Sequence, residues 1–238
     1  SRHDHEKNSK VLFFIDPYGY KDTPPKTLLD LKQNPNTEIM LFLPVSFIYR
    51  FIDSPKSNPT LYKWKTFMSI TGRPKDLLKI VDLITKRFSL AGFYSGSFIL
   101  NNQQNSNKYA IFFVSSNVYG LEKFNETKWA IDPIDGSQMC RNFTGEVIPS
   151  IAEEWRLASL DKLSNSIKEH ISAKPNKMID NIELYDVVIR QGFLPRHFNE
   201  VWKKKPFLKR EFLTSKTRSN YIGYDYTKRD PLVKFWLQ

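Results

Sequence analysis

The chain has 238 residues, of which 40% are hydrophobic and 14% aromatic, and its formal net charge is +11. This composition can supply a buried core and excludes a globally disordered chain, while the longest apolar runs, such as residues 39–45, are too short to cross a bilayer, so we expect no membrane segment. The single cysteine, Cys140, excludes an intramolecular disulfide and a cysteine-based metal site, and it favours a cytoplasmic protein.

The first predicted element is a buried strand over residues 11–15, which follows a polar segment, 1–9, that we expect to be a tail. Five apolar residues in succession are typical of a strand that is covered on both faces. Asp16-Pro17 ends the strand, and Tyr18-Gly19 forms a turn beyond it. Ligands of open α/β sheets bind outside the carboxyl ends of the strands. The segment is therefore a candidate site, and the alternative is an ordinary strand end followed by turn residues.

The next segments predict an α/β sheet that ends in a hairpin. A helix over 27–32 and a buried strand over 38–43 follow the first strand, and a strand–helix–strand unit of this length implies parallel pairing. Strands over 93–100 and 108–115 are joined by a polar connection of seven residues, which implies an antiparallel hairpin. Three helices are predicted between the second and third strands, at residues 45–52, 62–70 and 75–88.

The remaining sequence predicts helices and then a small basic domain. Helices are expected over 120–130 and 151–171, and Lys174-Pro175-Asn176 marks a boundary. Beyond it the pattern is helix, tight turn, helix and β-hairpin, which is the element order of a winged helix. We therefore expect an α/β domain over 10–173 and a winged-helix-like domain over 174–238. The elements expected in the second domain are helices over 182–190 and 196–204 and strands over 207–213, 220–226 and 232–237.

Positive charge is concentrated at the carboxyl end of the chain. Residues 201–238 contain ten Lys or Arg against three acidic residues, a net charge of +7. This asymmetry favours nucleic acid or an acidic protein surface as the partner, and the alternative is a solvated basic face. In a winged helix the second helix enters a groove and the wing contacts phosphates. The residues expected to bind nucleic acid are Arg196, His197, Lys203, Lys204, Lys205, Lys216 and Arg218.

Several stretches, in this order and spacing, resemble the three-Cys-motif partner protein family. They are residues 11–19, 38–43, 109–114 with 120–129, and 195–202. The resemblance covers most of the chain from Lys10 onward. The family is similar to Rossmann-fold methyltransferases, whose sheet ends with its last strand antiparallel to the others. The resemblance therefore implies S-adenosylmethionine as cofactor and a separate protein with three cysteines as a partner.

The resemblance also implies roles for the residues that follow the first strand. Asp16-Pro17-Tyr18 resembles the Asp-Pro-Pro-Tyr sequence of amino-group methyltransferases, with one proline instead of two. By position, Asp16 and the Pro17 carbonyl would accept hydrogen bonds from the target amine, and Tyr18 would stack on an extruded base. Gly19, Tyr20 and Lys21 would line the mouth of the substrate pocket.

The chain departs from the family in its glycines. Family members hold the methyl donor with an acidic, glycine-rich turn in an N-terminal half, whereas this sequence has nine glycines and no G-x-G cluster. Three explanations remain open: the chain is a fragment, another chain supplies the missing half, or the donor site is absent. Because half a doubly wound sheet leaves a bare strand edge, we expect the edge at residues 11–15 to be covered by a segment outside this sequence or by a second copy.

Two functional hypotheses follow. The first is an S-adenosylmethionine-dependent methyltransferase-like protein that acts on or binds nucleic acid. The second is a non-catalytic partner or scaffold subunit that binds another protein or nucleic acid through its basic carboxyl-terminal domain. Binding of the methyl donor separates the two.

Overall fold

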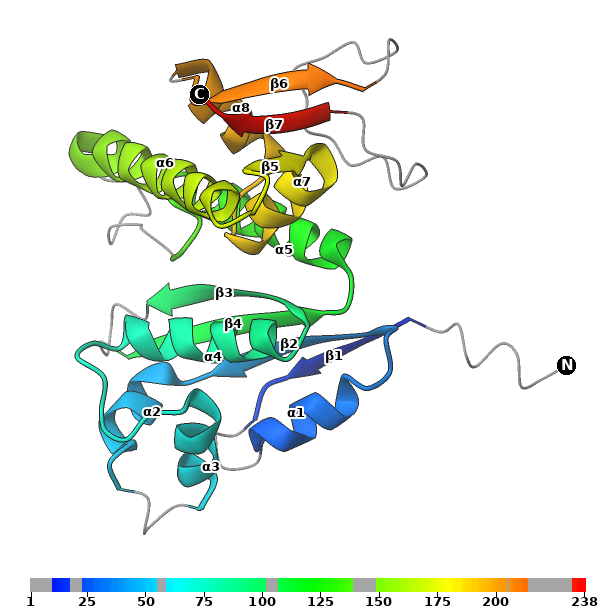
Figure 1. Cartoon of the computed structure of the whole chain (residues 1–238). Coiled ribbons are helices and arrows are strands. Elements are labelled where there is room, and N and C mark those ends of the chain that lie inside the picture. Colours follow the sequence, from blue (N-terminus) through cyan, green and yellow to red (C-terminus); the bar gives the residue numbers. More distant parts are fainter. Residues whose placement is uncertain are drawn as a thin grey trace, which may run out of the picture.

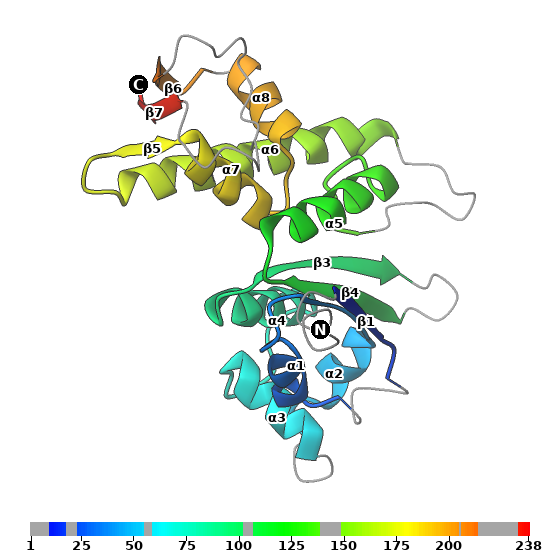
Figure 2. The same ribbon diagram turned by 90° about the vertical axis from the view of Figure 1, so that its right-hand side faces the viewer.

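The computed structural model describes residues 10–17, 23–54, 59–101, 107–138, 149–204, 206–213 and 233–238. These residues confirm the expected α/β class and form two units (Figure 1). The sheet unit, up to residue 138, contains a four-stranded sheet, and the C-terminal unit, from residue 149, contains a three-stranded sheet and three helices. Helix α5 (Val118–Ile131), the last helix of the sheet unit, lies between its sheet and the C-terminal unit in both ribbon views (Figures 1 and 2). None of the helices described is long and apolar enough to cross a membrane.

The first sheet has the strand order β1-β2-β4-β3, and one of its strands opposes the others. Strand β1 pairs parallel with β2, while β4 is antiparallel to both β2 and β3, so β1, β2 and β3 share one direction. The predicted parallel unit and the predicted hairpin are both confirmed. The strands are β1 (Val11–Ile15), β2 (Thr37–Leu43), β3 (Tyr94–Asn101) and β4 (Lys108–Ser115).

Helices cover the two faces of this sheet unequally. On one face, alternate residues of β2 (Ile39, Leu41 and Leu43) are completely buried beneath four helices. On the opposite face lies α5, where Phe124 stacks on Phe113 of β4 with ring centroids 5.2 Å apart. The four helices are α1 (Pro25–Leu31), α2 (Val45–Phe51), α3 (Pro59–Met68) and α4 (Leu78–Leu90).

Strand β1 is an exposed edge strand, and the expectation that it is buried is wrong for this chain. Leu12, Phe13 and Phe14 are 58%, 37% and 63% exposed. The physical reason is that β2 occupies one edge of β1 and no described residue pairs with the other. The prediction that a further segment or a second copy covers this edge is not tested by a single chain.

The described part of the C-terminal unit has three helices packed with an antiparallel sheet of order β5-β7-β6. The expected strand over 232–237 is confirmed as β7, whereas β5 was not predicted, and the expected strand over 220–226 lies outside the described residues. Asp180 caps α7 by accepting hydrogen bonds from the N–H groups of residues 182 and 183. The elements are α6 (Pro149–Ser172), β5 (Met178–Asp180), α7 (Asn181–Arg190), α8 (Pro195–Lys204), β6 (Leu208–Phe212) and β7 (Val233–Leu237).

Helix α6 packs with the C-terminal unit, although the sequence pattern placed it before the expected domain boundary. Leu160, Leu163 and Ile167 are buried in the same apolar cluster as Leu184 of α7 and Phe198 of α8. The helix contacts α7, α8 and β7. A stripe of apolar residues along one helix face shows that the helix is covered, but it does not identify the element that covers it.

Candidate functional site

Asp16 and Pro17 lie at the carboxyl end of β1, as the sequence predicted. The Asp16 side chain is exposed and forms no ion pair with a described residue. The remaining residues of the predicted substrate site, Tyr18, Gly19, Tyr20 and Lys21, lie outside the described residues. The structure thus places the proposed hydrogen-bond acceptors at an exposed strand end.

A groove of about 580 Å³ lies between the sheet and α5, at the opposite end of β1 from Asp16. Its floor is apolar and includes Met40 and Phe113, and its rim carries Glu38 and Lys123. The Glu38 carboxylate accepts a 2.9 Å hydrogen bond from the Ser115 hydroxyl, so the acid at the rim is already bound within the protein.

Three of the described glycines leave no room for S-adenosylmethionine. A donor site of the expected kind needs a backbone cradle at which a glycine leaves room for the ligand. At Gly96, Gly120 and Gly136 a Cβ would meet other side chains of the protein within 3 Å. These three glycines serve internal packing, so none of them can form the cradle of a donor site. The described residues also contain no cluster of three or more His, Cys, Asp or Glu side chains that could hold a metal ion.

Helix α8 separates its buried and charged residues sharply. Phe198 and Val201 are buried in the core of the C-terminal unit, whereas Arg196, Lys203 and Lys204 are exposed. We call these three cations the α8 basic face. The predicted phosphate-binding residues Lys205, Lys216 and Arg218 lie outside the described residues.

One acidic residue, Glu200, lies on α8 between the cations. It forms ion pairs with Arg156 of α6 and with Lys204, the latter at 3.2 Å. Because its carboxylate pairs with Arg156 and Lys204, Glu200 offsets part of the positive charge of the α8 basic face, above all that of Lys204.

His197 does not belong to the α8 basic face, and its predicted contact with nucleic acid is wrong. The side chain is only 2% exposed, and its ring centroid lies 3.9 Å from that of Trp129 in α5. Its Nδ1 accepts a 3.1 Å hydrogen bond from the Leu194 N–H, just before α8 begins. Burial, followed by the nearby positive charges of Arg196 and Arg156, lowers the pKa of His197 to about 3. The neutral ring therefore fixes the start of α8 and cannot reach a phosphate.

Strand β6 adds cations that the sequence analysis counted but did not assign to a site. Lys209 is exposed, and the Arg210 guanidinium lies 4.7 Å from the ring of Trp202 and 4.8 Å from that of Phe212. The sequence could have predicted such contacts, because aromatic residues are interspersed among the basic residues of 202–212. A cation of this kind stacks favourably on a neighbouring aromatic ring.

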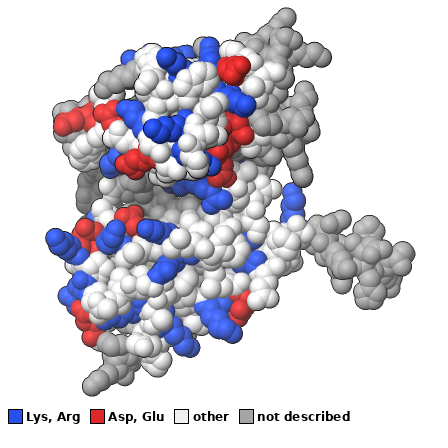
Figure 3. Space-filling model, viewed as in Figure 1, with Lys and Arg blue, Asp and Glu red and all other residues white. Residues whose placement is uncertain are grey.

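Acidic and basic side chains are mixed on at least one face of the molecule. In the view of Figure 3, acidic and basic side chains are interspersed over the C-terminal unit, and scattered cations cover the sheet unit. On α8, three exposed cations accompany one partly buried acidic residue, Glu200.

Comparison with known proteins identifies no relative of this chain: no family model, no curated protein and no solved structure matches it. The resemblance to the three-Cys-motif partner proteins therefore stays a prediction.

Proposed function

We propose that this protein binds nucleic acid through its C-terminal unit. The element order α6-β5-α7-α8-β6-β7, with strand order β5-β7-β6, supports a winged-helix arrangement of this unit. In that arrangement α8 is the helix that enters a groove of the duplex.

The observation that carries the proposal is the α8 basic face. Arg196, Lys203 and Lys204 project from the helix that a winged helix presents to nucleic acid, while Phe198 and Val201 anchor the other side of the same helix. Lysine and arginine bind phosphates and release condensed counterions from the duplex. The buried His197 and Trp129 support α8 from below, so the cations are carried by a rigid element.

Salt-dependent binding tests this proposal. The affinity of the full chain for a fluorescent DNA duplex and for an RNA duplex is measured by anisotropy over a series of salt concentrations. Replacing Arg196, Lys203 and Lys204 with glutamine is expected to weaken binding and to reduce the slope of log affinity against log salt by about 0.9 for each phosphate that the protein no longer neutralises.

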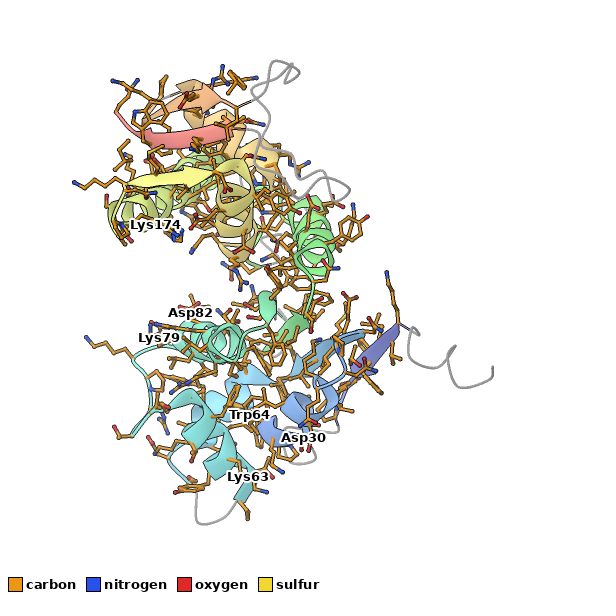
Figure 4. All side chains as sticks on the ribbon, turned by 45° about the vertical axis from the view of Figure 1, so that its right-hand side comes forward. Asp30, Lys63, Trp64, Lys79, Asp82 and Lys174 are labelled. Carbon is orange, nitrogen blue, oxygen red and sulfur yellow. The ribbon has the colours of Figure 1, made fainter. Side chains whose placement is uncertain are left out.

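A matched control removes three cations from the sheet unit. Lys63 on α3 and Lys79 on α4 are exposed and lie far from α8 (Figure 4), and Lys86 on α4 is also exposed. Glutamine at these three positions changes the net charge equally and is expected to leave the salt slope unchanged. Absence of binding at low salt, or equal weakening by both triple variants, overturns the proposal.

Methyl transfer is the second candidate function, and the topology of the first sheet favours it. The order β1-β2-β4-β3 with only β4 reversed is the order in which methyltransferase sheets end, and Asp16-Pro17 lies at the carboxyl end of β1. In this proposal Asp16 and the Pro17 carbonyl accept hydrogen bonds from a target amine.

Isothermal titration of S-adenosylmethionine into the chain tests the second candidate. Heat of binding that saturates at one donor per chain supports it. No binding removes methyl transfer as a function of this chain and favours the non-catalytic partner subunit, which would bind other macromolecules, including the three-cysteine protein that the resemblance implies.

A further inference from the structure

The outer edge of β1 presents, at alternate residues, backbone groups that pair with no described strand. The Val11 N–H donates a 3.1 Å hydrogen bond to the Asn36 carbonyl, so the backbone groups of Val11, Phe13 and Ile15 face β2. Because successive residues of a strand point their N–H and C=O groups to opposite sides, those of Leu12 and Phe14 face away from β2. No strand among the described residues receives them.

Apolar side chains flank this free edge on both faces of the sheet. Leu12 and Phe14 lie on the α5 side, opposite Glu38 and Met40 of β2, and Phe13 lies on the other side. Leu12 and Phe14 are more than half exposed. A flat apolar edge strand of this kind is a template for pairing with another strand.

We propose that β1 pairs antiparallel with β1 of a second copy of this chain, about a two-fold axis that passes beside Phe13. In this register Phe13 lies opposite Phe13 of the second copy, and Leu12 lies opposite Phe14. The axis falls at a non-hydrogen-bonded pair, and the outward N–H and C=O groups of Leu12 and Phe14 form the hydrogen-bonded pairs on either side of it. The two four-stranded sheets become one.

Charge complementarity identifies a second copy as the occupant. Lys10 and Asp16 are each exposed, carry opposite charges and are three residues from Phe13 in opposite directions. The same axis therefore places Lys10 of one copy opposite Asp16 of the other, twice per dimer. An isologous interface requires such self-complementarity, because each residue of the patch meets its counterpart from the same patch.

Neighbouring registers lack this complementarity. Only residues whose backbone groups face outward can form the hydrogen-bonded pairs, so Leu12 and Phe14 must lie opposite even-numbered residues of the second copy. The neighbouring allowed registers therefore differ from the proposed one by a shift of two residues. The register centred on Leu12 places Lys10 opposite Phe14, and the register centred on Phe14 places Asp16 opposite Leu12. Each therefore sets a charge against an apolar side chain. Only the register centred on Phe13 pairs unlike charges at both ends.

The groove beside α5 extends the same surface. Lys10 and Leu12 line the groove, and the proposed register sets Phe14 of the second copy against Leu12. The ring of that phenylalanine then covers apolar surface next to the groove floor at Met40. This inference concerns the sheet unit and does not depend on nucleic-acid binding by the C-terminal unit.

Charge exchange tests the register. Sedimentation velocity of the full chain over a range of concentrations is expected to show a reversible dimer of twice 28.0 kDa. Lys10→Asp and Asp16→Lys each set like charges opposite one another twice per dimer and are expected to raise the dissociation constant about tenfold. The double exchange restores unlike pairs and is expected to restore dimerisation. Failure of the double exchange to restore it overturns the proposed register.

Two further variants keep the proposal testable if a charge variant folds poorly. Leu12→Pro removes an outward N–H that β2 does not use, so it is expected to leave the fold intact and abolish the dimer. Phe13→Cys sets two thiols opposite each other at a non-hydrogen-bonded pair, where Cα atoms are about 4.5 Å apart, and is expected to give a disulfide-linked dimer on oxidation. The unchanged chain, with Cys140 alone, is the control. A chain that stays monomeric at all concentrations, or a Phe13→Cys variant that does not cross-link, overturns the proposal.

Discussion

The Tyr94 hydroxyl donates a 2.7 Å hydrogen bond to Asp186 Oδ1, and this bond joins the first sheet to the C-terminal unit. Tyr94 begins β3 and Asp186 lies on α7. Arg190 completes the contact: it donates to Asp186 Oδ2 at 2.7 Å, and its guanidinium lies 3.9 Å from the centre of the Tyr94 ring. A carboxylate held by two donors from different units is a specific connection between them.

Removing the Tyr94 hydroxyl is expected to weaken this connection. Burial, followed by the hydrogen bond to Asp186, raises the pKa of Tyr94, so the folded state favours the neutral phenol. The stability from this group is therefore present below pH 10 and is lost as pH rises further. Tyr94→Phe is expected to lower the free energy of unfolding by about 1 kcal/mol at pH 7 and to flatten the decline above pH 10. Urea denaturation over pH 7–11 measures both. An equal decline in both proteins contradicts the prediction.

Sequence patterns predicted the parallel unit and the hairpin of the first sheet, because hydrophobic runs, prolines and polar turns are local signals. They did not predict that β1 is exposed in the single chain, since the apolar run shows only that both of its faces suit burial. Three-residue β5 was too short to give a pattern. The ion pair of Arg156 with Glu200 joins residues 44 positions apart, which no local pattern reports.

The burial of His197 could have been predicted from its position in the helical pattern, although its basic neighbours suggested a surface role. His197 and Val201 are four residues apart and so share a face of α8. Because Val201 is apolar, that face is the buried one. The helical period therefore separates His197 from Arg196 and Lys203, which residue type alone does not.

The buried His197 is expected to make stability depend on pH below 7. Its pKa is about 3 in the folded chain, lower than in the unfolded chain, so the unfolded state binds a proton first as pH falls. Stability from the neutral ring is present above pH 6.5 and is lost progressively towards pH 3. His197→Asn keeps an acceptor for the Leu194 N–H but does not titrate. Its free energy of unfolding is expected to fall less steeply than that of the parent chain from pH 7 to 4. Parallel profiles would show that the ring is already protonated or exposed.

The buried Lys128 is expected to make the free energy of unfolding rise with pH in the alkaline range. Its ammonium is buried on α5, donates to the Ser97 carbonyl at 3.2 Å, and has its pKa lowered to about 8 by burial, against the raising effect of Asp135 and Asp132. The unfolded lysine stays protonated to higher pH, so stability is lower below pH 8 and rises between pH 8 and 10.5. Lys128→Met is expected to remove this rise, which is on the order of 3 kcal/mol. Thermal unfolding in matched buffers measures it, and a rise that survives in the variant contradicts the assignment.

Alanine substitutions at two glycines with positive φ, Gly136 and Gly92, distinguish the cost of backbone strain from the cost of a side-chain collision. Gly136 has φ +64°, and a Cβ there would lie 2.8 Å from the Trp129 indole, whose N–H donates to the Gly192 carbonyl at 2.9 Å. Gly92 has φ +90°, and a Cβ there would meet no atom within 4 Å. Both alanine variants carry the strain of a left-handed conformation, which costs about 1 kcal/mol.

Gly136→Ala is expected to cost a further 1–3 kcal/mol, roughly, because the Trp129 ring cannot move without separating from the His197 ring. Chemical denaturation of the two variants gives the difference directly. Since His197 fixes the start of α8, Gly136→Ala is also expected to weaken nucleic-acid binding, whereas Gly92→Ala leaves it unchanged. Equal loss of stability in the two variants would show that Trp129 adapts freely, and α8 would then not depend on its position.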